Sequence, residues 1–169
     1  MGPASPAPTL SVEPTSCSSL KDRGKLTSNC GNPNPTPTPY ARRIYNAAVK
    51  DKGMSDRNLY GAPYREECVA AVQQVLADAG LSQMLNSAGN PYLDVDDFVS
   101  ALSTSGYSET SSPVPGDIVD LSGQHVGIYL GGGEMLSNGS TSGLFDWEDS
   151  PANENASEGN GPITYYHHN

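Results

Sequence analysis

A thiol and an imidazole in this sequence have the types and the surroundings of a nucleophile and its base. Cys68 stands in the first turn of a strongly helical segment, where unpaired N–H groups and the helix dipole favour a thiolate. His125 opens the stretch His-Val-Gly-Ile-Tyr-Leu, which is typical of a strand, so that its imidazole can face the helix start. The pattern predicts nucleophilic attack by Cys68 on a carbonyl carbon, with His125 as the base.

A catalytic imidazole is usually oriented by a third polar group that accepts its other N–H. The strand expected after His125 ends in Ser137 and Asn138, and both lie near the imidazole if the two strands form a hairpin. An amide oxygen is the stronger acceptor, which favours Asn138. Strand alternation turns only one of the two inward, and a miscounted loop exchanges them, so both stay candidates.

Three helices are expected in the first half of the domain. Apolar residues recur at helical spacing over 40–50, and Gly53 follows as a stop. The helix over 66–80 has two acids at its front and a glycine at its end. The third covers 95–102, with Asp94 as its cap.

Beyond Gly106 the apolar pattern changes to the period of strands. Pro115-Gly116 marks a turn, and the segments 117–121, 125–130 and 134–136 predict three short antiparallel strands. Two further strands are expected at 144–147 and 163–166, on either side of a polar loop at 148–161. Helices followed by strands predict an α+β fold.

The chain divides by composition into a segment 1–39 and a domain 40–169. Eight of the prolines precede Tyr40 among Ser, Thr, Asn and Gly, which predicts a flexible tail or a linker for attachment to a larger assembly. This segment also holds Cys17 and Cys30, whose pairing the sequence leaves open. The sequence shows neither a signal peptide at its start nor an apolar run long enough to span a membrane.

The net charge excludes one large class of partners. Nine Lys and Arg residues stand against 19 Asp and Glu, which gives −10 at pH 7. Nucleic-acid binding depends on clustered cations that neutralise phosphates. We therefore expect no nucleic acid as a partner.

Four motifs in order along the chain resemble those of the NlpC-type cell-wall peptidases and, more loosely, the CHAP amidases, both of the papain-like group. The motifs are Gly61-Ala62-Pro63-Tyr64, Glu67-Cys68, Pro115-Gly116-Asp117 and the strand from His125 to Gly133. The resemblance covers residues 41–138. It implies a papain-like fold, with helices packed on a small antiparallel sheet and the nucleophile opening the central helix.

The resemblance also implies roles for individual residues. Cys68 matches the nucleophile, His125 the base, and Tyr64 a tyrosine that lines the site. Counting from the histidine places the third member at Ser137, whereas chemistry favours Asn138. The family's usual Asp-Cys-Ser-Gly is replaced here by Glu67-Cys68-Val69-Ala70, so Glu67 and Val69 are candidates for altered substrate contacts.

The expected function is hydrolysis of an amide bond in the stem peptide of peptidoglycan, with no cofactor and no metal. The resemblance implies that the protein is secreted, injected or virion-associated and acts at the bacterial cell wall. Two alternatives stay open. One is a catalytically silent binding or structural module of a phage tail or delivery device, and the other is a papain-like acyltransferase or transglutaminase-type enzyme.

Three weaker features complete the sequence picture. His167 and His168 lie near the chain end without a third ligand beside them, which favours a frayed terminus over a metal site. Asp94, Asp96 and Asp97 lack the remaining positions of a calcium loop and indicate a helix start. Acidic residues beside Trp147 suit either a sugar, by stacking and hydrogen bonds, or a solvated acidic loop: Asp146, Glu148 and Asp149.

Overall fold

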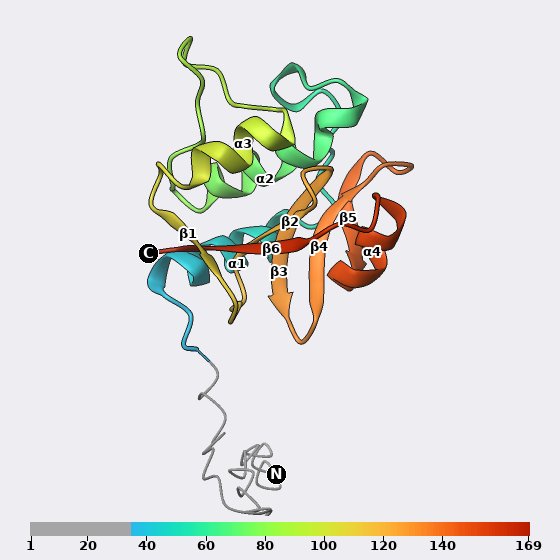
Figure 1. Ribbon diagram of the computed structural model, residues 1–169. Helices are drawn as coiled ribbons and strands as arrows, with labels where there is room; N and C mark the ends of the chain where they lie inside the picture. Colours follow the sequence, from blue (N-terminus) through green and yellow to red (C-terminus); the bar gives the residue numbers. More distant parts are fainter. Residues whose placement is uncertain (1–34) are drawn as a thin grey trace, which may run out of the picture. The chain divides into compact units, whose positions relative to one another are not determined.

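One antiparallel sheet of six strands forms the centre of the structure, a computed structural model that describes residues 35–169. The strand order is β1-β6-β2-β3-β4-β5, so that β1 and β5 are the edges, and all neighbouring pairs run antiparallel (Figure 1). The strands are β1 (Tyr107–Thr110), β2 (Ile118–Leu121), β3 (His125–Gly131), β4 (Glu134–Gly139), β5 (Leu144–Asp149) and β6 (Ile163–His168). The predicted hairpin of the strands that carry His125 and Ser137 is confirmed as β3–β4.

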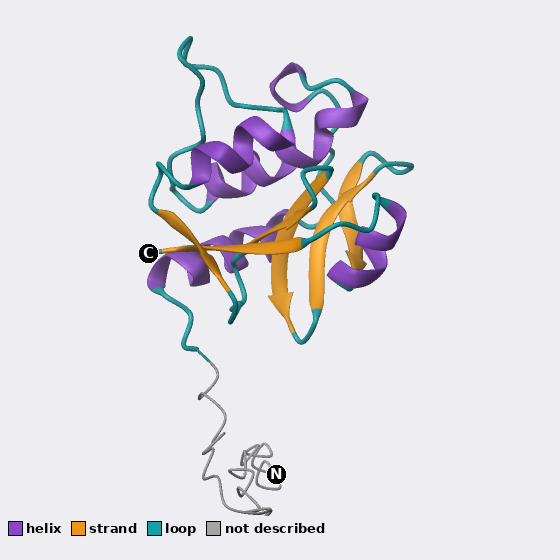
Figure 2. Ribbon diagram, viewed as in Figure 1, coloured by secondary structure: helices purple, strands orange, loops and turns teal. Residues whose placement is uncertain are grey.

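Four α-helices accompany the sheet, so the predicted mixed α+β class is confirmed (Figure 2). They are α1 (Pro39–Asp51), α2 (Glu67–Asp78), α3 (Val95–Leu102) and α4 (Pro151–Ser157), with two short 3-10 turns, η1 (Leu59–Gly61) and η2 (Tyr64–Glu66). The first three helices agree with the predicted ones. Most of the predicted linker 1–39, and the cysteines at 17 and 30, lie outside the described residues.

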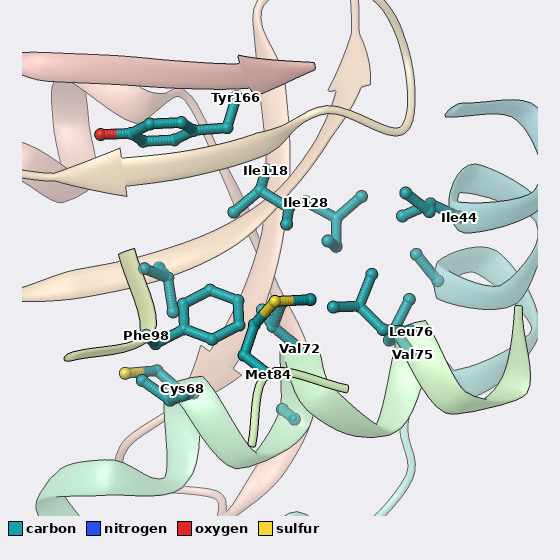
Figure 3. Packing of buried hydrophobic residues seen from close by; sticks show 14 of the residues in the cluster. Ile44, Cys68, Val72, Val75, Leu76, Met84, Phe98, Ile118, Ile128 and Tyr166 are labelled. Atoms are coloured by element: carbon teal, nitrogen blue, oxygen red, sulfur yellow. The ribbon is translucent and has the colours of Figure 1, made fainter. Parts of the chain in front are cut away.

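The main core lies between helices α1 to α3 and one face of the sheet. Ile118 and Ile128 project from the sheet toward α2, and Phe98 of α3 fills the space beside them (Figure 3). All three side chains are fully buried. Because each such residue contributes roughly 2 kcal/mol through burial, this core fixes α2 firmly over the sheet.

Side-chain caps determine where the helices begin. The Thr38 hydroxyl accepts a hydrogen bond from the N–H of Ala41 at 3.1 Å, and Pro39 occupies the first turn of α1. Asp94 accepts from the N–H of Asp97 at 3.2 Å, as the sequence predicts for α3. Both helices therefore begin at residues whose side chains satisfy a backbone N–H of the first turn.

The Pro-Gly-Asp motif is a packing device that joins the sheet to α1. Gly116 has a φ of +99°, and its N–H donates to the carbonyl oxygen of Tyr129 at 2.8 Å. A Cβ at this position would collide with the backbone carbonyl of Ala41 in α1. Only glycine permits both the turn and this close approach.

Two elements were not expected from the sequence. The predicted polar loop 148–161 contains helix α4. Pro151 is its first residue, and the Ser150 hydroxyl caps it by accepting a hydrogen bond from the N–H of Asn153 at 3.2 Å. Strand β1 pairs with β6, so that His167 and His168 lie within a strand. The prediction of a frayed terminus is therefore wrong, because β1 supplies the hydrogen-bonding partner that the sequence did not reveal.

Within residues 35–169, no helix combines the length and the apolar character needed to cross a membrane.

Candidate active site

Cys68 lies in the first turn of α2, where the 3-10 turn η2 ends and the helix begins. It is 4% exposed and lines a cleft of about 820 Å³. Figure 3 shows its side chain at one end of the packed cluster, near Phe98. The thiol is thus held by the core on one side and faces a cavity large enough for a substrate segment on the other.

His125 is the first residue of β3, opposite Leu121 of β2. Its side chain is 12% exposed and lines the same cleft as Cys68. Burial lowers the pKa of His125, but hydrogen bonding to Cys68 and Glu154, with the negative charge of both groups, outweighs this and raises the pKa to about 10. The imidazole consequently holds its proton at neutral pH.

Glu154, in the first turn of α4, is the acidic partner of His125. Its Oε2 lies 3.4 Å from His125 Nε2, and its side chain is only 5% exposed. The 3.4 Å separation is longer than an ordinary hydrogen bond and makes this an ion pair when the imidazole is protonated. The chain therefore brings together a thiol, an imidazole and a carboxylate from α2, β3 and α4.

Sequence reasoning missed Glu154 because it placed a loop where α4 forms. The local signal was present: Ser150-Pro151 is a typical helix start, and it puts Glu154 in the first turn of a helix. What the sequence did not give was the packing of α4 against β2 and β6. That contact determines where Glu154 points.

Ser137 and Asn138, the two predicted third members, occupy different places. Ser137 is fully buried on β4, and its hydroxyl donates to both carboxylate oxygens of Glu154, at 3.0 and 3.3 Å. Asn138 is 6% exposed and lines the cleft. In the described part of the chain, the carboxylate that pairs with the His125 ring belongs to Glu154. Ser137 contacts that carboxylate.

The three predicted substrate contacts also separate. Tyr64 is 58% exposed and lines the cleft. Val69 is fully buried in the main core and Glu67 is 4% exposed, and neither lines the cleft. The expectation that these two touch substrate is corrected, because their positions on α2 turn both side chains into the protein.

Asp56 is a second buried carboxyl group, close to Glu67. Unlike Glu154, it has no hydrogen-bonding hydroxyl and no imidazole beside it in the part of the chain that the structure describes. Asp56 is fully buried, and neither of its carboxyl oxygens has a hydrogen-bond partner. Burial, followed by the charge of Glu67, raises the pKa of Asp56 to about 6. Among the described residues, Asp56 is therefore a buried acid without a hydrogen-bond partner, close enough to Glu67 at the start of α2 to feel its charge.

Acidic side chains surround the cleft that holds Cys68 and His125. They come from η2, from the start of α3 and from the end of α4: Glu66, Asp94, Asp96 and Glu158.

Across residues 35–169, no group of three His, Cys, Asp or Glu side chains is arranged to hold a metal ion.

Comparison with family models and with curated proteins finds no match to this chain. The fold and the site define a mixed α+β protein in which a cysteine, an imidazole of raised pKa and a carboxylate line one cleft.

Proposed function

We propose that the protein is a papain-like cysteine peptidase or amidase that cleaves an amide bond in the stem peptide of peptidoglycan. The observation that carries this proposal is the sequence of contacts from Cys68 through His125 to Glu154 beside one open cleft. A thiol, an imidazole and an orienting acceptor constitute the apparatus of nucleophilic acyl transfer.

In the proposed mechanism, the Cys68 thiolate attacks the amide carbonyl carbon, and the carbonyl π electrons move onto oxygen. Unpaired N–H groups at the start of α2 stabilise this oxyanion. The His125 imidazolium gives its proton to the nitrogen of the leaving amine as the C–N bond breaks. Water then attacks the thioester, His125 accepts its proton, and the acid product leaves with Cys68 restored as thiolate.

Glu154 has an electrostatic role in this scheme. Its carboxylate faces Nε2 of His125, so the ring is oriented with its other nitrogen toward the thiol. The carboxylate also stabilises the positive charge that the imidazole carries between proton transfers. Ser137 fixes Glu154 through its donated hydrogen bond and acts as a positioning residue.

The choice of substrate rests on the resemblance to cell-wall peptidases, carried by the Gly-x-Pro-Tyr, Glu-Cys, Pro-Gly-Asp and His-Val-Gly-Ile-Tyr motifs. A cleft of about 820 Å³ suits an extended peptide segment. The same resemblance supports action at the bacterial cell wall, after secretion, injection or delivery by a virion.

The test is incubation of purified peptidoglycan with the full chain and with Cys68→Ala, with the soluble fragments identified by mass spectrometry. We expect new free amines and soluble muropeptides only with the unchanged protein. A variant at the second histidine of the sheet, His167→Gln, is the matched control and should retain activity.

Absence of fragments with both proteins, under conditions where Cys68 reacts with a thiol reagent, would overturn wall hydrolysis. Coupled adducts in place of hydrolysis products would instead identify an acyltransferase.

A further inference from the structure

A second hollow, of about 410 Å³, adjoins the catalytic cleft at the edge of the sheet. It is formed by the turn between β4 and β5 and by the outer strand β5. Thr141 and Trp147 line both cavities, so the two adjoin at these side chains. A ligand that extends across Thr141 and Trp147 therefore contacts the cleft and the hollow.

Trp147 is the only tryptophan of the chain, and it is 47% exposed on an edge strand. Phe145, two residues earlier on the same strand, is fully buried in the main core. An indole that is half open to solvent beside a hollow offers a flat apolar surface with a polar N–H at its rim. The face suits a flat ligand with one apolar side.

The polar groups of the hollow are held in place before any ligand binds. The Ser142 hydroxyl donates to Asp146 Oδ1 at 3.0 Å, and the N–H of Leu144 donates to the same hydroxyl at 3.2 Å. Arg57 donates to the backbone oxygens of Thr141 and Ser142, both at 3.4 Å. A site with fixed acceptors loses little entropy on binding.

Charge narrows the chemistry of the occupant. The carboxylates of Asp146 and Glu148 line the hollow, and Glu148 is already paired with Lys52 at 2.8 Å. Carboxylates accept hydrogen bonds from hydroxyl groups and repel anions. A neutral pyranose ring has both features required here, an apolar C–H face for the indole and hydroxyl donors for Asp146.

We propose that this hollow is a sugar subsite, in which Trp147 stacks on a neutral N-acetylhexosamine ring of the glycan and Asp146 accepts a hydrogen bond from a ring hydroxyl. The link to a glycan that carries a peptide rests on the proposed function. The adjoining cavities then place the sugar in the hollow and the peptide attached to it in the cleft. Trp147 discriminates between substrates that carry a sugar and free stem peptides.

The test uses Cys68→Ala protein, so that no ligand is cleaved, and follows the intrinsic fluorescence of Trp147. The probes are tri-N-acetylchitotriose, a disaccharide-peptide muropeptide and the same peptide without sugar. We expect the first two to shift or quench the emission in a saturable manner, and the free peptide to give a smaller change because Trp147 also lines the cleft. Asp146→Asn in the same background keeps the fluorophore and should weaken binding of the trisaccharide by about fivefold.

Kinetics give the second readout. Trp147→Ala should raise KM for the disaccharide-peptide by about tenfold with kcat unchanged, and should raise KM for the free peptide much less. Tyr60→Ala, at an exposed aromatic outside both cavities, is the control. No emission change with either sugar ligand, or a change with the free peptide alone, overturns the sugar subsite even if the wall is cleaved. Saturable binding of the trisaccharide by a protein that cleaves no wall leaves the subsite standing and overturns the hydrolase.

Discussion

The sheet carries two histidine–carboxylate pairs that share the same chemical groups but differ in separation and surroundings. His125 lies 3.4 Å from Glu154, whereas His167 Nδ1 lies only 2.7 Å from Asp117 Oδ1. Within residues 35–169 the shorter pair has no thiol beside it, and it lines neither of the two cavities described above. Proximity of an imidazole to a carboxylate therefore does not by itself identify a candidate catalytic pair; the neighbouring thiol and cleft are what distinguish His125 and Glu154.

The remaining contacts of the two carboxylates point to different work. The other oxygen of Asp117 accepts from the N–H of Val114 at 2.8 Å, so that this carboxylate closes the turn before β2. Glu154 accepts from a side-chain hydroxyl and faces a charged ring. Burial raises the pKa of Asp117, and the hydrogen bonds from Val114 and His167 oppose this rise. We assign Asp117 to folding and Glu154 to the proposed chemistry.

The largest expected effect comes from breaking the candidate catalytic pair with Glu154→Gln. The amide keeps the size of the side chain but removes the charge that stabilises the imidazolium, so kcat/KM should fall about 100-fold. Loss of the carboxylate also lowers the pKa of His125 from about 10, and the basic limb of the pH profile should move to lower pH. The measurement is kcat/KM against pH. An unchanged profile would show that Glu154 has no part in catalysis.

Breaking the other pair should affect stability and spare activity. Asp117→Ala leaves the buried N–H of Val114 and the ring of His167 without their acceptor, at a cost of about 2 kcal/mol in the free energy of unfolding. Urea denaturation measures this loss, and kcat/KM of the folded variant should stay within about twofold. A large fall in kcat/KM would place the second pair in the catalytic apparatus. Exposed Ser103→Ala is the control for both measurements.

A third carboxyl sharpens the comparison because it is buried with no partner. The pKa of Asp56 is about 6 in the folded chain, above its ordinary value of 3.8, so the ionised form is disfavoured by folding. Stability should therefore fall as pH rises from about 4 to 6 and remain lowered above that window. Asp56→Asn removes this penalty and should be more stable than the unchanged protein by about 2 kcal/mol at pH 7.5, with the difference lost near pH 4.

Denaturation of both proteins at the two pH values measures the effect, and Glu109→Gln, at an exposed position, is the matched control. A stability difference independent of pH would mean that Asp56 does not titrate in this window.

Much of the fold follows from local pattern. The apolar stripe and the Asp94 cap predicted α3 to its residue limits, and the alternating segments predicted the strands from β2 to β6. The elements that the sequence did not predict are those that form only through contacts with segments distant in the chain. Strand β1 is polar and exists through its pairing with β6, and α4 has only seven residues and packs against β2 and β6. Short elements of this kind gain little from propensity alone.

The same distinction applies to the site. Cys68 and His125 were predicted because each belongs to an element with a clear pattern. We expected the third candidate residue on the strand next to His125, where Ser137 and Asn138 lie. The carboxylate that pairs with His125 belongs instead to Glu154 of α4, a helix that packs against β2 and β6. Counting along the chain led to Ser137, which touches the carboxylate itself.

The smallest effect is expected at Ser137, which acts on the imidazole only through Glu154. Ser137→Ala removes a hydroxyl that donates to the carboxylate at 3.0 Å, so kcat should fall about fivefold with KM unchanged. The decisive measurement is a double-mutant cycle with Glu154→Gln. If Ser137 is a positioning residue, its substitution has no further effect on kcat in the Glu154→Gln background. Equal effects in both backgrounds would instead show that the hydroxyl acts independently of Glu154, and the contrast with the Asp117 pair would then rest on the thiol and the cleft alone.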